Sequence, residues 1–320
     1  MRQTHVCVLY GGRSVERDVS VATGHRVARA LQARGYEVTG IDVDETLVRR
    51  LKEMRPDLVF IAVHGRGGED GTIQELLEIL GLKYTGAGVL ASLRAIDKVL
   101  TKRILQAEGI PTPPFQAFSE AAFHDLGAKD TLEMIVEELG LPLVVKPAAQ
   151  GSAFGISIVP GFEGLPKALA TALSFDGKVL LEKYVSGREL AVSIMGGGKR
   201  EIETLPIVEA VPRSEHPFYD FDSRYVLGET DFIVPAELDP EVETEVLQVA
   251  RNTYLALGCS GFGRVDVILD DAGHPWVLEL NTIPGLTESS LMPLAAEAAG
   301  LSFEDLVQAM VDSAVVADSA

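Results

Sequence analysis

Residues 264–281 read RVDVILDDAGHPWVLELN, and this stretch decides the fold of the C-terminal part of the chain. Polar and apolar residues alternate on both sides of the turn residues Asp271-Ala272-Gly273, which predicts a β-hairpin. The alternation sorts the side chains onto two faces of the hairpin. The polar face carries Arg264, Asp266, Glu279 and Asn281. The opposite face is expected to turn toward a core and carries Val265, Val267, Leu278 and Leu280.

The polar face of this hairpin predicts a metal site. Mg²⁺ prefers oxygen ligands, and in nucleotide sites it is usually held by one or two carboxylates together with phosphates. We therefore expect Asp266, Glu279 and Asn281 to bind magnesium. A solvated hairpin face is the alternative, but isolated acids are more typical of such a face than a close Asp/Glu/Asn set opposite apolar residues.

A second signal lies at Lys146, the charge that ends the apolar run 143–145. The loop QGSAFG at 150–155 follows it, and its small residues would allow backbone N–H groups to approach a phosphate beside the lysine. The familiar nucleotide fingerprints are absent, since Gly11-Gly12 does not extend to G-x-G-x-x-G and no G-x-x-x-x-G-K-[ST] occurs. A plain hairpin turn is the competing interpretation of this loop.

The remaining pattern predicts an α/β protein. Strands at 5–10 and 58–63 enclose a helix at 20–34, and a helix at 73–80 follows, which is typical of a small parallel-sheet domain. Prolines at 111, 113 and 114 predict a linker. Farther strands are expected at 141–146, 156–159, 179–185, 189–195 and 202–211, and helices at 97–108, 131–139, 165–174 and 241–257. We divide the chain into domains 1–96, 97–186 and 187–320.

Composition limits the functional classes. The 320 residues are 47% hydrophobic and 23% charged, which is typical of a globular protein. The net charge of −19 disfavours nucleic acid and anionic membranes as partners. Cys7 and Cys259 stand alone, which argues against a zinc site or a disulfide scaffold. We found no signal peptide and no apolar run of about 18 residues, so a cytoplasmic protein is expected.

Four stretches together resemble the D-alanine:D-alanine ligase family of ATP-grasp ligases. They are GGRSVERDVS at 11–20, HGRGGEDGT at 64–72, GRVD at 263–266, and ELNTIPGLT at 279–287 with Ser289-Ser290. The likeness spans essentially the whole chain, and several motifs of this length in family order are specific. The resemblance implies three α/β domains, the first with a parallel sheet, and ATP bound between the second and third.

The resemblance also implies an ATP site. Lys98 and Lys146 correspond to the lysines that hold the phosphates, and the loop at Ser152 closes over them. The strand with Glu182, Lys183 and Val185 corresponds to the one that reads adenine, and Glu189 is placed for the ribose. Arg224 replaces a lysine of many relatives and is expected to keep a phosphate contact with different geometry. Asp266, Glu279 and Asn281 correspond to ligands of two Mg²⁺ ions, for which Mn²⁺ would substitute.

For the substrates, the resemblance implies two D-alanine sites. Glu16 corresponds to the carboxylate that pairs with the ammonium of the first D-alanine, near His64. Arg264 and the N–H of Gly285 correspond to the pair that stabilises the tetrahedral oxyanion. Together with Arg264, Ser290 and the N–H of Leu291 correspond to the groups that hold the second carboxylate.

The segment 218–230 is expected to be a lid. Its Tyr225 corresponds to a tyrosine that bonds toward Glu16 and Ser152 in dipeptide-forming relatives, so D-alanine is expected as acceptor rather than D-lactate. Ala153 stands where many relatives have a second serine.

The activity implied is ATP-dependent ligation of two D-alanines through an acyl phosphate, as in peptidoglycan precursor synthesis, by a homodimer. Two alternatives stay open at this point. One is an ATP-grasp ligase for another pair of amino acids, and the other is a non-catalytic protein that closes around a small molecule.

Overall fold

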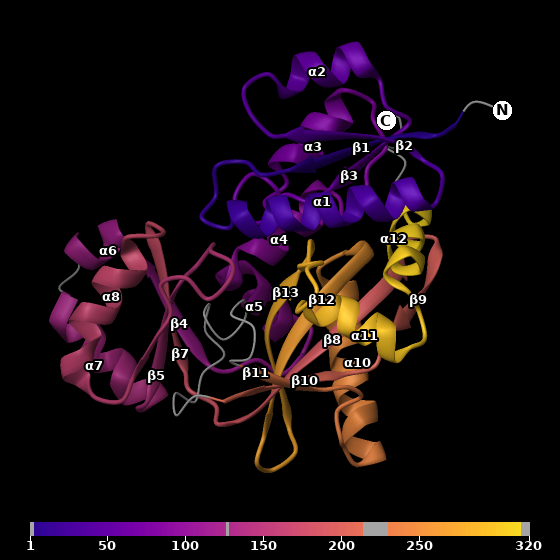
Figure 1. The fold of residues 1–320 in the computed structure, drawn as a ribbon. Helices are drawn as coiled ribbons and strands as arrows, with labels where there is room; N and C mark the ends of the chain where they lie inside the picture. Colours follow the sequence, from indigo (N-terminus) through magenta and orange to yellow (C-terminus); the bar gives the residue numbers. More distant parts are fainter. Residues whose placement is uncertain (1–2, 126–127, 214–229, 315–320) are drawn as a thin grey trace.

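The computed structural model describes residues 3–125, 128–213 and 230–314, which form three sheets with helices packed against them (Figure 1). The predicted α/β class is confirmed. In these three ranges no helix combines the length and the apolar character that crossing a bilayer requires.

The N-terminal sheet is parallel, in the order β2-β1-β3. Its strands are β1 (His5–Tyr10), β2 (Glu37–Asp42) and β3 (Leu58–Ile61). Its helices are α1 (Arg17–Ala33), α2 (Leu47–Met54) and α3 (Thr72–Ile79). The expected strands and helices of this region are present. The additional strand β2 escaped prediction because it is a largely solvent-facing edge strand without an apolar run.

The second sheet has the order β4-β7-β5-β6, with antiparallel pairing throughout. Its strands are β4 (Phe115–Ser119), β5 (Leu143–Pro147), β6 (Ser157–Val159) and β7 (Lys178–Lys183). Its helices are α6 (Glu120–Asp125), α7 (Ala128–Leu139), the 3₁₀ turn Phe162–Gly164 and α8 (Leu165–Leu173). Apolar residues of α7 and α8 pack on the strands in a core that this segment forms alone.

The third sheet has the order β11-β10-β8-β12-β13, and β9 pairs with β8. Its strands are β8 (Gly187–Gly197), β9 (Arg200–Thr204), β10 (Val208–Pro212), β11 (Thr230–Ile233), β12 (Ser260–Asp270) and β13 (Pro275–Asn281). The single strand expected at 202–211 is in fact β9 and β10. The break falls at Pro206, which has no N–H to give to a strand ladder.

Helices from both ends of the chain cover this sheet. They are α4 (Val89–Ile96), α5 (Lys98–Ala107), α10 (Pro240–Ala256), α11 (Leu291–Ala298) and α12 (Phe303–Asp312). α4 and α5 both contact β13, so the boundary placed after residue 96 separates two helices that share one sheet. The division into three domains stays a prediction.

A β-bulge interrupts the hairpin of β12 and β13. Asp266 pairs with Glu279, but the next residue, Val267, pairs with Val277, so Leu278 is an extra residue in β13. Val277 therefore occupies the core, whereas Leu278 is half-buried and lies outside it. The expectation that Leu278 faces the core is wrong, because strict alternation fails at a bulge.

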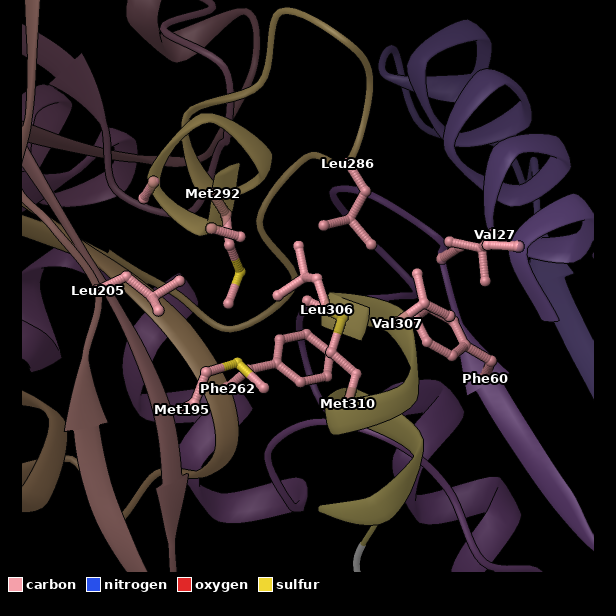
Figure 2. Packing of buried hydrophobic residues seen from close by; sticks show 14 of the residues in the cluster. Val27, Phe60, Met195, Leu205, Phe262, Leu286, Met292, Leu306, Val307 and Met310 are labelled. Carbon is pink, nitrogen blue, oxygen red and sulfur yellow. The ribbon is translucent and has the colours of Figure 1, made fainter. Parts of the chain in front are cut away.

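One apolar core joins the first and third sheets (Figure 2). Val27 of α1 and Phe60 of β3 belong to the same cluster as Phe262 of β12, Met292 of α11 and Leu306 of α12. This shared core fixes α1 and β3 relative to α11 and the loop before it.

Candidate active site

Two neighbouring pockets lie where the three sheets meet. The first has about 490 Å³ of empty space, and the second about 710 Å³, a size typical of small-molecule sites. The first pocket is lined by Glu16, His64, Glu69, Ser152, Arg264, Asn281, Ile283, Gly285, Ser289, Ser290 and Leu291. We call it the acceptor pocket. The expected substrate residues that the structure describes are all brought together here.

Glu16 stands at the N-terminus of α1 with its carboxylate buried in the acceptor pocket. The hydroxyl of Ser152 donates to Oε1 in a short hydrogen bond. A Cβ atom added at Gly65 or Gly151 would lie 2.4 Å or 2.8 Å from Oε2, so a larger residue at either position would displace this carboxylate. Gly65 also has a φ of +72°, which favours glycine.

The electrostatics of Glu16 suit a cationic ligand. Among the described residues, Oε2 is buried without a hydrogen-bond partner. Burial and, next, repulsion by Glu69 raise the pKa of Glu16 to about 7, although the hydrogen bond from Ser152 opposes this shift. An ammonium group placed at Oε2 would supply the missing donor and favour the charged carboxylate.

His64 follows β3 and is bonded to the protein through both ring nitrogens. Nδ1 donates to the carbonyl of Ile283 at 3.0 Å and lies 3.4 Å from Glu69 Oε1, while Thr23 Oγ1 is 3.1 Å from Nε2. The ring thus ties α1 and β3 to the loop after β13. Glu69 was not singled out from the sequence, although it stands inside the quoted 64–72 motif.

The opposite wall of the acceptor pocket comes from β12 and the loop before α11. Arg264 is buried and makes a bidentate ion pair with Asp266, at 2.6 Å and 2.7 Å. Ser290 immediately precedes α11 without a side-chain hydrogen bond to the helix, and its hydroxyl accepts from the N–H of Thr287 at 3.0 Å. Leu291 begins this helix, whose unpaired N–H groups favour an anion.

The second pocket, which we call the nucleotide pocket, lies between the second and third sheets. It is lined by the charged residues Lys98, Lys146, Glu182, Lys183, Glu189 and Glu279. Its apolar walls come from Val144, Ile156, Val185, Ile268 and Leu278. A flat aromatic base would fit between such walls, next to the backbone at the end of β7. The bulged Leu278 is part of this wall and was missed because it was assigned to the core.

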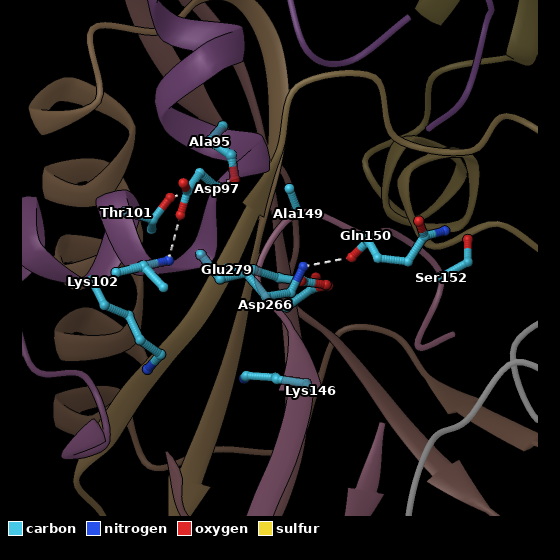
Figure 3. A network of polar contacts seen from close by, with 12 residues as sticks. Ala95, Asp97, Thr101, Lys102, Lys146, Ala149, Gln150, Ser152, Asp266 and Glu279 are labelled. Atoms are coloured by element: carbon cyan, nitrogen blue, oxygen red, sulfur yellow. Dashed lines mark hydrogen bonds and ion pairs between the residues drawn. The ribbon is translucent and has the colours of Figure 1, made fainter. Parts of the chain in front are cut away.

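Lys98 lies where the two pockets meet. Its Nζ is 3.0 Å from Glu279 Oε2 and donates to the carbonyl of Gln150 at 2.7 Å (Figure 3). Asp266 and Glu279 are directly opposite each other across the strands, as are Arg264 and Asn281. The hairpin therefore presents two carboxylates and an amide between the nucleotide pocket and the acceptor pocket.

Three further points concern the predicted residues. Arg224, Tyr225 and the lid up to residue 229 lie outside the described residues. Ser152 has a φ of +49°, and it faces Glu16 in the acceptor pocket rather than the nucleotide pocket. Lys102 was missed, although it follows Lys98 by four residues and thus shares its helix face.

The chain is similar to known proteins along almost its full length. The family described as "D-ala D-ala ligase C-terminus" matches residues 104–312, and "D-ala D-ala ligase N-terminus" matches residues 48–87. A D-alanine–D-alanine ligase from Pelotomaculum thermopropionicum is 46% identical over 310 residues, covering 97% of this chain and 96% of that protein. A ligase of the same name from Moorella thermoacetica is 45% identical, with coverage of 97% and 99%.

Solved structures agree with these relatives. The crystal structure of a D-alanine–D-alanine ligase from Bacillus anthracis complexed with ATP is 34% identical, covers 97% of both chains and has a TM-score of 0.82. A D-Ala:D-Ser ligase from Enterococcus faecalis is 26% identical, covers 97% of this chain and 99% of that one, and has a TM-score of 0.81. The chain therefore belongs to the D-alanine–D-alanine ligase family and has the ATP-grasp fold of that family.

Proposed function

We propose that this protein joins two D-alanine molecules into D-alanyl-D-alanine at the expense of ATP. The observation that carries the proposal is the buried Glu16 carboxylate, whose Oε2 faces an acceptor pocket that also contains Arg264 and the N-terminus of α11. This pocket adjoins the lysine-lined nucleotide pocket. One amino acid can thus be held by its ammonium group and another by its carboxylate, beside the phosphates of ATP.

The reaction has two steps. A carboxylate oxygen of the first D-alanine attacks the γ-phosphorus of ATP, and ADP leaves. The amine of the second D-alanine then attacks the acyl phosphate carbon, and the tetrahedral intermediate expels inorganic phosphate. Lys98 and Lys146 bind the phosphates, with a further contact from Arg224, and Glu16 orients the first substrate. Positioning and charge stabilisation account for this kind of catalysis, and no covalent enzyme intermediate is needed.

Specific groups serve the second step. Arg264 and the N–H of Gly285 stabilise the oxyanion of the tetrahedral intermediate, while Ser290 and the N–H of Leu291 hold the carboxylate of the second D-alanine. Glu182, Lys183 and Val185 contact adenine, and Glu189 the ribose. The role expected of Tyr225 falls on a residue outside the described part of the chain.

The hairpin residues fit magnesium bound together with a nucleotide. Among the described residues, no three His, Cys, Asp or Glu side chains are grouped to hold a metal. Two carboxylates and an amide, from Asp266, Glu279 and Asn281, suit Mg²⁺ ions that take their remaining ligands from phosphates and water. Mg²⁺ would neutralise phosphate charge, and Mn²⁺ would replace it.

Glu279→Gln should remove most phosphate release at millimolar Mg²⁺. Circular dichroism should show that the variant stays folded.

Phosphate release with ATP and D-alanine, L-alanine, D-serine or no amino acid tests the activity. We expect release with D-alanine alone, and D-alanyl-D-alanine as the product by chromatography. Release that needs D-serine would favour a D-alanyl-D-serine ligase, for which the Enterococcus faecalis relative is the precedent. Absence of release with every amino acid would favour a binding protein.

A mixed reaction of D-alanine and D-lactate at pH 7 tests the expectation from Tyr225 that D-alanine is the acceptor. Substantial depsipeptide would contradict it.

The site of action and the assembly state complete the proposal. The use of ATP as a substrate favours the cytoplasm. The contacting helices α3 and α4 expose Ile79, Leu90 and Leu93, with relative accessibilities of 76%, 65% and 47%, and these side chains support a homodimer interface there. Light scattering on the wild type and on Leu90→Lys tests this, because a dimer that uses the surface should dissociate in the variant.

A further inference from the structure

Lys102 is a buried lysine beside the nucleotide pocket. It lies on α5 one turn after Lys98, and its side chain has no exposed surface. Its Nζ forms a short ion pair with Glu182 Oε2 and donates to the hydroxyl of Thr112. That hydroxyl donates in turn to the carbonyl of Val277 at 2.8 Å, next to the bulge in β13. Lys102 is therefore held by protein groups alone and is not among the residues lining the pocket.

Glu182 is shared between two lysines. Its Oε1 accepts from Lys146 Nζ at 2.9 Å, while its Oε2 faces Lys102. Burial acts to raise the pKa of Glu182, but the two lysines, with Lys102 first, outweigh burial and lower the pKa. A buried carboxylate that loses its counter-ion is strongly destabilised, so at least one lysine must stay with Glu182.

The two lysines differ in whether they can reach a ligand in the nucleotide pocket. Lys146 lines the nucleotide pocket, and among the described residues its ammonium donates to Glu182 only. Lys102 lies outside the pocket and is fixed by Thr112. Burial lowers the pKa of Lys102 to about 8 against the attraction of Glu182, so the side chain keeps its charge at neutral pH.

We propose that Lys102 is the permanent counter-ion of Glu182, and that it allows Lys146 to leave this carboxylate and bind the phosphates of ATP. Lys102 is thus a positioning residue that acts through Glu182 and Lys146. The inference rests on the proposed use of the second pocket for ATP. Without Lys102, Glu182 would keep Lys146 as its sole cation and would compete with the phosphates for it.

Calorimetric titration of the full-length protein with ATP, ADP and adenosine, in the presence of Mg²⁺, tests this inference. In Lys102→Met we expect the affinity for ATP and ADP to fall about tenfold or more, because removing one partner of a buried pair is costly. The affinity for adenosine should stay within about twofold of wild type, because adenosine has no phosphate for Lys146 to bind. Lys178→Met is the matched control, since Lys178 pairs with Asp97 at the start of the same helix and is 42% exposed.

A double variant tests the route through Glu182. In the Glu182→Gln background, adding Lys102→Met should change ATP affinity less than about twofold, because a neutral amide does not hold Lys146. Should Lys102→Met fail to fold by circular dichroism, Lys102→Gln takes its place. Glutamine can still bond to Glu182 and Thr112 but carries no charge, and it should show the same ATP-specific loss.

Two results would overturn the inference. Equal losses for adenosine and ATP would mean that Lys102 only shapes the adenine wall, and unchanged ATP affinity would mean that Lys146 needs no release. Both results are measured as nucleotide affinities. They are therefore distinct from failure of the proposed activity, which would appear as wild-type protein that binds ATP but releases no phosphate with D-alanine.

Discussion

At the scale of single residues, Glu16 combines two properties that work against each other. Its buried carboxylate faces Glu69 and is short of one hydrogen-bond donor among the described residues, which costs stability. The same features leave it ready for an ammonium ligand. Groups at binding sites often keep such unfavourable arrangements because a ligand offsets them.

Binding of the first D-alanine should depend on pH. With a pKa of about 7, Glu16 is mostly protonated at pH 6 and mostly ionised at pH 8, whereas the ligand ammonium stays charged throughout. We expect D-alanine affinity, measured by calorimetry with ADP present, to fall about tenfold from pH 8 to pH 6. Glu16→Gln should bind D-alanine weakly at both values. A flat wild-type profile would contradict the role given to Glu16.

The same residue predicts a gain in stability on mutation. The pKa of Glu16 is about 7 in the folded protein and near 4.5 ordinarily, so folding binds protons between these values. The contribution of this group to stability is complete below about pH 4.5 and is lost as pH rises to 7. Glu16→Gln should therefore be more stable than wild type by about 1–3 kcal/mol at pH 8 and similar to it at pH 4.5. Scanning calorimetry at both values decides, and a variant that melts lower at pH 8 would refute the argument.

At the scale of the secondary-structure elements, the sequence predicted long apolar and alternating segments well. β1, β3, α1 and the polar face of the hairpin were predictable because burial on one side imposes a period on the residues. The edge strand β2 and the division of β9 from β10 depend on pairing and on one proline. Leu278 was misplaced because a bulge changes the register without a local signal.

The bulge predicts different outcomes for two neighbouring truncations. Val277→Ala removes a fully buried core side chain and should lower the free energy of unfolding by about 2 kcal/mol. Leu278→Ala should cost less stability but weaken adenosine binding about threefold, because this side chain lines the nucleotide pocket. Thermal melts and adenosine titrations of both variants provide the check. If Leu278→Ala were the more destabilising of the two, Leu278 would have to face the core.

At the scale of the whole molecule, the acceptor pocket depends on contacts between distant segments. Glu16, Ser152 and Arg264 come from three sheets or the loops between them, and the loop before α11 is held from α1 and from β3. The sequence could name these residues through family motifs. It could not supply the tethers such as Arg26 and Thr23, because they depend on how the first and third sheets pack.

Arg26 of α1 provides such a tether. It donates to the carbonyl of Leu286 at 2.7 Å and lies 3.7 Å above the ring of Phe303. Arg26→Ala should loosen the Gly285 loop and raise the KM for the second D-alanine about tenfold, with the KM for ATP unchanged. Arg34→Ala is the control, because Arg34 also joins α1 to α12, through Asp305, but on the surface. Equal effects of the two variants would show that any link between these helices is sufficient.

The separate core of the second sheet has a consequence for how the molecule opens. All apolar members of that core lie between residues 118 and 181, whereas the core in Figure 2 joins segments from both ends of the chain. Amide hydrogens should therefore exchange in two cooperative groups, with residues 115–183 opening more readily than the remainder. Residues of both groups line the nucleotide pocket, so ATP should slow exchange in the first group until the two rates converge. Deuterium uptake measured by mass spectrometry with and without ATP would test this. The bound nucleotide would then couple two separately opening folding units, so that they behave as one.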